Sequence, residues 1–266
     1  MSLTLKSLGN IIAFMLFRLI LSGFLIFSFS SCTGEITILK GTEKELYDSI
    51  IEEINKERKY LILGGTDYKK VEHLVTTLQI RYPYSQYTRE VYLFQGDISY
   101  KRKRHATAIR HYKEFVKNQI NHPKINYATF KIFDSYSKLI KNTDKDIGPA
   151  LDVIDAYRSL SDSYLNSEFM EATTTIYNSA RKFVLKRTIY ISRFYIQKKE
   201  FESAYSRIEN ANVAIPDLVQ NSYEAQYLKI LCMSKIEDDD SLIKNLINAY
   251  KIKFPKSPFL DDLSEI

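Results

Sequence analysis

Few side chains of this 266-residue sequence have the spacing that a catalytic or metal-binding site requires. Its four histidines are scattered, outside any His-Glu-x-x-His pattern that would bind zinc. They are His73, His105, His111 and His122. The two cysteines, Cys32 and Cys232, cannot form a Cys-x-x-Cys cluster, and Gly64-Gly65 alone does not make a phosphate-binding loop. The sequence therefore predicts a protein that is not an enzyme and that holds no metal or cofactor.

Two clusters of charge have simpler interpretations than a binding site. Asp238-Asp239-Asp240 precedes Ser241 and a periodic apolar segment, so it is expected to cap a helix and to complement its dipole. Lys101-Arg102-Lys103-Arg104-His105 falls between two expected helices and has no aromatic residue in stacking register. We interpret this run as a solvated turn or, second, as a contact for an acidic protein surface. No nucleic-acid partner is expected.

The first 34 residues have the character of a secretory signal. They contain no acidic residue, and Lys6 and Arg18 are their only charged side chains. Residues 19–29 are apolar or small, and a short apolar run after a basic start is typical of a signal peptide. A membrane span needs about 20 apolar residues and would have to bury Arg18, so an uncleaved anchor is the alternative. Translation from Met1 or from Met15 stays open.

Cys32 is the residue of this region that could carry chemistry. Phe29-Ser30-Ser31-Cys32 resembles the processing box of bacterial lipoproteins, with Phe29 where Leu is usual. The resemblance implies that the signal is cut before Cys32 and that fatty acids such as palmitate are attached to it. Thr33, where an Asp would retain the protein in the inner membrane, implies sorting to the outer membrane. Two or more acyl chains anchor stably because each buried methylene contributes roughly 0.8 kcal/mol. We therefore expect a lipid-anchored protein on the periplasmic face of the cell outer membrane.

The composition of the chain predicts helices. It contains only 8 Gly and 6 Pro, too few for the many turns of a barrel or sandwich. Hydrophobic residues make up 45% of the chain, enough for a core. Cys232 lies in the apolar stretch of residues 228–233, so a buried structural thiol is expected there. The predicted fold class is all-α.

Proline and apolar spacing indicate a repeat. Val71, Ala204 and Ile243 each stand 12 residues before a proline, and each is followed at offsets of 4 and 7 by residues on the same helix face. Residues 108–115 and 150–157 repeat the first part of the pattern without the proline. The pattern resembles the second helix of a tetratricopeptide repeat, which implies an α-solenoid of five helix pairs. We expect the pairs at about 43–83, 87–120, 125–164, 168–216 and 221–255, with an irregular helical bundle as the alternative.

Two details sharpen this expectation. Tyr92 and Gly96 stand at the large and small positions of the first helix in the second pair, where a small residue lets two helices approach and an aromatic ring fills the space opposite. Residues 168–197 contain neither Pro nor Gly and predict one long helix.

The expected organisation has five parts. They are a lipoprotein signal peptide at 1–31, a flexible tether at 32–42, N-terminal repeats at 43–164, C-terminal repeats at 165–258 and a tail at 259–266.

Three segments resemble the BamD family of outer-membrane assembly lipoproteins. Residues 81–87 carry an aromatic-Pro segment after the first pair, and residues 122–128 carry His-Pro-x-x-x-Tyr after the second. Residues 185–207 are similar to the penultimate repeat of that family. The third pair departs from the pattern, because residues 163–167 lack the aromatic-Pro. The resemblance covers roughly residues 43–258.

This resemblance implies a non-enzymatic scaffold of the β-barrel assembly machinery, the BAM complex. Its implied partners are the periplasmic domains of BamA, other BAM lipoproteins and unfolded outer-membrane β-barrel proteins, which it would help to fold and insert. It places a BamA contact at Arg207, in the C-terminal repeats. No carboxylate lies three or four residues from Arg207, so its charge is not satisfied within its own helix. The implied peptide groove in the N-terminal repeats comprises Tyr60, Leu63, Leu93, Asp97 and Tyr100.

Two other functions remain as alternatives. One is another tetratricopeptide-repeat lipoprotein of the envelope, which coordinates cell-wall or trans-envelope machinery and would not need the His122-Pro123 match. The other is a glycan-capturing lipoprotein beside a transporter. Such proteins are longer and usually stack sugars on tryptophan, and this chain has none.

Overall fold

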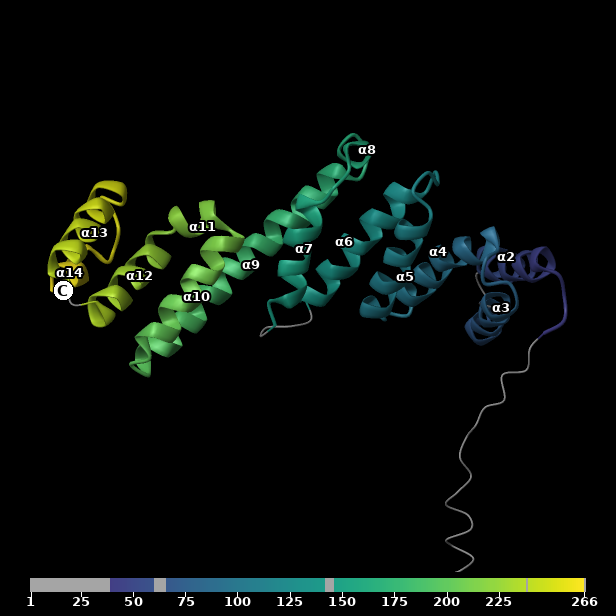
Figure 1. The fold of residues 1–266 in the computed structure, drawn as a ribbon, viewed down its shortest axis with the longest axis horizontal. Helices are drawn as coiled ribbons and strands as arrows, with labels where there is room; N and C mark the ends of the chain where they lie inside the picture. The colour runs from purple at the N-terminus through teal and green to yellow at the C-terminus, as the bar shows by residue number, and fades with distance from the viewer. Residues whose placement is uncertain (1–38, 60–65, 142–145, 238, 266) are drawn as a thin grey trace, which may run out of the picture. The chain divides into compact units, whose positions relative to one another are not determined.

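A computed structural model describes residues 39–59, 66–141, 146–237 and 239–265 (Figure 1). The chain divides into two units, Met1–Lys40 and Gly41–Ile266, of which the second holds nearly all of the described residues. Thirteen helices and no strand occur in the described ranges, and all of the helices belong to the second unit. No helix of these ranges is long and apolar enough to cross a bilayer.

The long helices form five consecutive pairs, which confirms the predicted all-α repeat fold. The pairs are α2 Glu43–Lys59 with α3 Tyr68–Arg81, α4 Gln86–Lys101 with α5 His105–Asn118, α6 Ile125–Lys141 with α7 Gly148–Arg158, α9 Met170–Gln197 with α10 Phe201–Ala214, and α12 Tyr223–Ile236 with α13 Asp240–Lys253. Three short helices complete the unit: α8 Asp162–Leu165, α11 Pro216–Gln220 and α14 Leu260–Ser264. The long helix expected at 168–197 is α9, with 28 residues.

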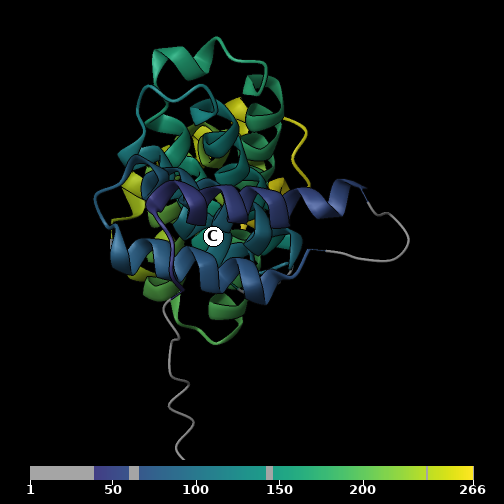
Figure 2. The ribbon, with the colours of Figure 1, turned by 90° about the vertical axis from the view of Figure 1, so that its right-hand side faces the viewer.

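Within Gly41–Ile266, helices that follow one another along the chain pack side by side. Viewed end on, α2 crosses in front of the later helices, which lie behind it (Figure 2). The repeat positions form the contacts between helices: Ala204 and Ile208 of α10 are fully buried, and Val71 and Val75 of α3 are too. The spacing of 0, 4 and 7 therefore marks the inward face of each second helix.

The second pair shows why a small residue is needed. Gly96 of α4 faces the ring of Tyr112 in α5, and a Cβ placed on Gly96 would lie 2.5 Å from Tyr112 Cε1. That distance is far below van der Waals contact, so only glycine permits this approach of the two helices. Tyr92 packs against the same core from the preceding turn of α4.

Two tight turns join the helices of a pair through a lysine in the left-handed region. Lys103 has φ 58° between α4 and α5, and Lys199 has φ 63° between α9 and α10. In the first turn, the Arg104 N–H donates to the Ser99 carbonyl at 2.8 Å. In the second, the Glu200 N–H donates to the Tyr195 carbonyl at 2.9 Å. The basic run at 101–105 thus spans the turn between α4 and α5, as predicted, although Arg102 pairs with Glu72 of α3 instead of being only solvated.

Polar side chains cap several helices. Thr42 and Glu45 form a reciprocal capping box at the start of α2, because each side chain accepts a hydrogen bond from the other residue's backbone N–H. Asp239 caps α13 by accepting from the Ser241 and Leu242 N–H groups. The capping role expected for the aspartate run is confirmed at Asp239; Asp238 lies outside the described residues.

The third pair lacks the aromatic-Pro motif and has a buried tyrosine after its second helix instead. Tyr164 of α8 is 1% exposed, and its hydroxyl lies 2.5 Å from the Thr173 hydroxyl of α9. After the last pair, Leu260–Ser264 of the segment expected as a tail at 259–266 form α14, whose Leu263 is 1% exposed. Leu263 thereby covers the apolar end of the last pair.

Among the described residues, a large apolar cluster and a small one occupy the second unit from α4 onward, and buried residues of α3 such as Val71 belong to neither. The large cluster combines buried side chains from α4 through α12. The small cluster joins α12, α13 and α14 through Ile230, Ile247 and Leu263. Tyr227 of α12 packs against both clusters and connects them.

Cys232 is a free, fully buried thiol, and burial raises its pKa to about 11, in agreement with the predicted structural role.

Candidate functional site

A hollow of about 780 Å³ lies along the first helices of the first three pairs, α2, α4 and α6. Its lining combines aromatic rings with side chains of both charges: Tyr47, Phe94, Tyr100, Tyr127, Asp48, Asp97, Lys124 and Lys131. Such a surface can hold apolar side chains against the rings and can bond polar groups through the carboxylates and ammonium groups.

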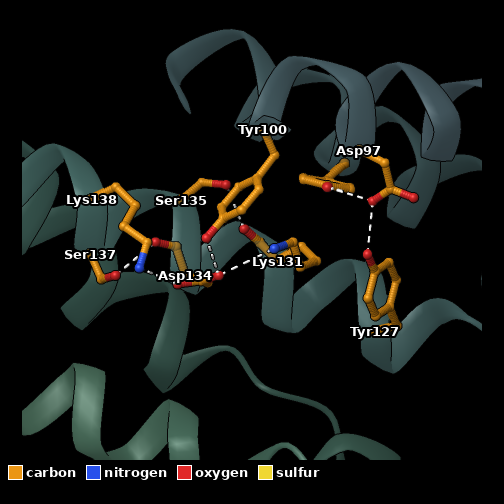
Figure 3. Close-up of polar contacts among 9 residues, drawn as sticks. Asp97, Tyr100, Tyr127, Lys131, Asp134, Ser135, Ser137 and Lys138 are labelled. Carbon is orange, nitrogen blue, oxygen red and sulfur yellow. Dashed lines mark hydrogen bonds and ion pairs between the residues drawn. The ribbon is translucent and has the colours of Figure 1, made fainter. Parts of the chain in front are cut away.

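Asp97 holds two tyrosines at this hollow. The hydroxyls of Tyr112 and Tyr127 donate to Asp97 Oδ1 at 2.7 and 2.9 Å. Burial and then the negative charge of Asp97 raise the pKa of both phenols above its ordinary value, so they stay protonated donors. Figure 3 shows the bond from Tyr127 on α6 to Asp97 on α4. Asp97 therefore fixes α4 against α5 and α6.

Tyr100 and Asp134 form a second link between α4 and α6. The Tyr100 hydroxyl donates to Asp134 Oδ2 at 2.6 Å, and Lys131 Nζ lies 3.2 Å from the same oxygen (Figure 3). Lys138 Nζ approaches Asp134 Oδ1 at 3.4 Å. Burial would raise the pKa of Asp134, but the Tyr100 hydrogen bond and the Lys131 charge outweigh it, so this pKa is lowered. Asp134 is therefore a carboxylate at neutral pH.

Lys131 also lies over the Tyr100 ring, with 3.1 Å between Nζ and the ring centroid. This cation–π contact and the Asp134 ion pair hold the ammonium group at the edge of the hollow. The site is thus preorganised, because its tyrosines, lysine and carboxylates are fixed by one another.

The structure brings together three of the five predicted groove residues. Asp97 and Tyr100 line the hollow of about 780 Å³. Leu93 is 3% exposed and packs in the core, where it lines a neighbouring hollow of about 650 Å³ together with Asp97. Tyr60 and Leu63 lie outside the described residues. Peptide binding by these residues stays a prediction.

Sequence reasoning missed the contribution of α6. Tyr127, Lys131, Asp134 and Lys138 recur at spacings of three and four residues, which places them on one helix face. That spacing was a usable signal, because a mixed polar and aromatic face on a buried helix requires partners across the groove.

Arg207 stands apart from this hollow, on α10. Ala204 and Ile208 are fully buried and Ala211 is 5% exposed, whereas Arg207 is exposed beside them. Among the described residues, Arg207 has no hydrogen bond or ion pair. Its neighbour Glu209, in contrast, pairs with Lys229 of α12 at 2.7 Å.

Two further predictions concern lipid attachment and metal binding. Cys32, the expected lipidation site, lies outside the described residues. In the described ranges, no group of three or more His, Cys, Asp or Glu side chains could hold a metal ion.

Comparison with known proteins places the chain in a family. A family model named YfiO, described as outer membrane lipoprotein, matches residues 41–235, well over half of the chain. A search of curated proteins with this chain found no match. The match begins just before α2 and ends in α12, so it covers the hollow between α2, α4 and α6 as well as Arg207. The chain therefore belongs to the YfiO family of outer membrane lipoproteins.

Proposed function

We propose that this protein is a non-enzymatic scaffold of the β-barrel assembly machinery. It binds the periplasmic domains of BamA through its C-terminal repeats and nascent outer-membrane proteins through its N-terminal repeats, with Cys32 as its lipid anchor. The observation that carries the proposal is the family match over residues 41–235, a family of outer membrane lipoproteins.

Arg207 is the residue proposed to contact BamA. Its exposure and its lack of a partner among the described residues support this role, since an unpaired guanidinium is free to bind a carboxylate bidentately. Charge reversal would then set two like charges against each other across the interface. Such a change costs about 2–5 kcal/mol of binding when the pair is buried on association.

The test is affinity purification of the full-length chain from detergent-solubilised membranes, with recovery of BamA measured by mass spectrometry. We expect wild type to recover BamA and Arg207→Glu to lose most of it. Arg110→Glu is the matched control, because Arg110 is also exposed, on the second helix of another pair, and has no ion pair among the described residues. Equal recovery of BamA by both folded variants would remove Arg207 from the interface. Absence of BamA from the wild-type sample would contradict the function.

The hollow between α2, α4 and α6 is proposed to bind the unfolded barrel protein. Its tyrosines and Phe94 suit apolar and aromatic side chains, and its lysines and carboxylates suit the backbone and polar groups of an extended peptide. We expect Tyr100→Ala to weaken binding of a peptide copied from an outer-membrane barrel strand. Tyr84→Ala is the control, since Tyr84 is 92% exposed and lies outside the hollow. Equal loss in both variants would argue against this site.

A further inference from the structure

A second exposed aromatic surface lies on α9, whereas Arg207 belongs to α10 and the hollow proposed to bind peptide is lined by α2, α4 and α6. Tyr190 and Phe194 are 63% and 51% exposed and stand four residues apart, so they share one face of the helix. Among the described residues they are the only pair of large exposed apolar side chains one helical turn apart. We call this surface, together with the hollow described next, the α9 face.

A hollow of about 440 Å³ adjoins Tyr190. Ile140 of α6 and Phe183 of α9 give it apolar lining, while Lys141, Lys186 and Arg187 give it three positive charges. The hollow is lined by the first helices of two neighbouring pairs. It therefore offers an apolar pocket surrounded by cations.

In the part of the chain that the structure describes, the cations of the α9 face have no acidic partner. Elsewhere on α9, Arg181 pairs with Asp217, and Arg193 pairs with Glu224 at 2.6 Å. Lys141, Lys186 and Arg187 form no ion pair with any residue in the described ranges. Among the described residues, α9 therefore carries positive charge that no ion pair neutralises.

Arg187 is also incompletely hydrogen-bonded. Its guanidinium lies 4.7 Å from the centroid of the Tyr190 ring, and its Nε is buried without a hydrogen-bond partner. A buried donor without an acceptor costs free energy, which an arriving carboxylate that reorients the guanidinium recovers. Lys198 similarly lies 5.9 Å from the Phe194 ring centroid. Each of the two exposed rings therefore has a cation beside it.

We propose that the α9 face binds an acidic segment of a partner protein. A carboxylate of that segment enters the hollow between Lys186 and Arg187, and a neighbouring apolar side chain packs on Tyr190 and Phe194. Aromatic residues and arginine are enriched at the centres of protein interfaces, which favours a protein partner over a membrane surface. This site is separate from Arg207 on α10 and does not depend on the identity of BamA.

The experiment uses the full-length chain in neutral detergent and a short fluorescent peptide in which glutamates flank a central phenylalanine. Fluorescence anisotropy at low salt measures its affinity. A second peptide carries glutamine in place of every glutamate. We expect the glutamate peptide to bind at least about tenfold more tightly than the glutamine peptide, and binding to weaken as salt is added.

Variants locate the binding. Arg187→Glu and Lys186→Glu should each weaken binding of the glutamate peptide by about tenfold or more, and Tyr190→Ala should weaken it with the charge unchanged. Lys251→Glu on α13 is the matched control, because Lys251 is exposed, has no ion pair in the described ranges and makes the same change of charge. Circular dichroism checks that each variant keeps its helicity. Lys186 is the more exposed of the two cations, so its variant tests the proposal even if Arg187→Glu does not fold.

Three outcomes would overturn the proposal. One is equal affinity of the glutamate and glutamine peptides for the wild-type chain. Another is an equal loss of affinity in Lys251→Glu and Lys186→Glu. The third is failure of the peptide to bind while phosphatidylglycerol-containing phosphatidylcholine vesicles bind through Lys186 and Arg187, which would assign the α9 face to a lipid surface. Arg207→Glu should leave peptide binding unchanged, so this test and the BamA test fail independently.

Discussion

The Tyr112 hydroxyl donates a 2.7 Å hydrogen bond to Asp97 Oδ1, and this bond joins the core of the second helix pair to the hollow beside it. The same Tyr112 ring lies against Gly96, the residue before Asp97 on α4. Packing of the repeat and orientation of the candidate groove therefore depend on one side chain.

Gly96→Ala should destabilise the protein through this contact. The added methyl group would lie 2.5 Å from Tyr112 Cε1, and overpacking of a filled core costs about 1–3 kcal/mol. Thermal unfolding followed by circular dichroism measures the loss. Gly148→Ala is the control, since a Cβ placed there would lie 3.1 Å from Oδ1 of the exposed Asp146 side chain, which can shift, and it should change stability by about 0.5 kcal/mol or less. Equal stability of wild type and Gly96→Ala would contradict the packing.

Glu53 should make the first helix pair sensitive to acid. Lys56 Nζ at 2.9 Å and Lys70 Nζ at 3.0 Å hold its pKa at about 2, against an ordinary value of 4.5. Because the folded-state pKa is lowered, this stabilisation is present above about pH 4.5 and is lost as the pH falls toward 2. Glu53→Gln should therefore unfold at a lower temperature than wild type at pH 7, and the difference should shrink toward pH 3.

The control for that series is the neighbouring Glu52→Gln. Glu52 is exposed and has no ion pair or hydrogen bond in the described ranges. The unfolding temperature of Glu52→Gln should equal that of wild type from pH 7 to pH 3. A constant difference between Glu53→Gln and wild type from pH 7 to pH 3 would contradict the ion-pair argument.

Lys199→Gly should stabilise the fourth pair. Lys199 has φ 63°, a conformation that costs an L-residue roughly 1–2 kcal/mol, whereas glycine adopts it freely. Glycine loses about 0.5–1 kcal/mol through its more flexible unfolded state, so the net gain should be up to about 1 kcal/mol. Lys198→Gly, at φ −84°, should instead destabilise the protein. Chemical denaturation compares the two, and the opposite order of stabilities would show that the turn is not strained.

Cys32→Ala should abolish lipid attachment. The prediction rests on the Phe29-Ser30-Ser31-Cys32 sequence alone. Metabolic labelling with palmitate, followed by immunoprecipitation, should show label in wild type and none in the variant. Cys232→Ser, which removes the only other cysteine, should keep the label. Label that persists in Cys32→Ala would overturn the lipoprotein assignment for that residue.

The fold could be predicted from sequence because its rules are local. Ala204 and Ile208 are both fully buried on one helix face, as their spacing requires, and the prolines fall at helix ends or first turns. Gly96 was recognisable as a small position, because a repeat template specifies which positions must be small.

The candidate site was less predictable because its contacts cross between helices. Tyr100 and Asp134 are 34 residues apart in sequence, and no local pattern pairs them. Leu93 fits the groove template by position, yet its packing in the core depends on how closely α5 and α6 approach. The burial of Tyr164 was unpredictable for the same reason. Tyr164 is buried where the third pair lacks the aromatic-Pro motif, and its hydroxyl contacts Thr173 in the next pair.

Because buried side chains of α13 and α14 form a small cluster of their own, we expect the last helix pair to open as a distinct cooperative unit. Since Ile230, Ile247 and Leu263 pack among themselves and meet the large cluster through Tyr227, opening of α13 and α14 leaves the larger core intact. Amide protons there should exchange with solvent faster than those of α5 or α6. A partner that binds this end would slow exchange locally, so hydrogen exchange could report its docking without a signal from the groove.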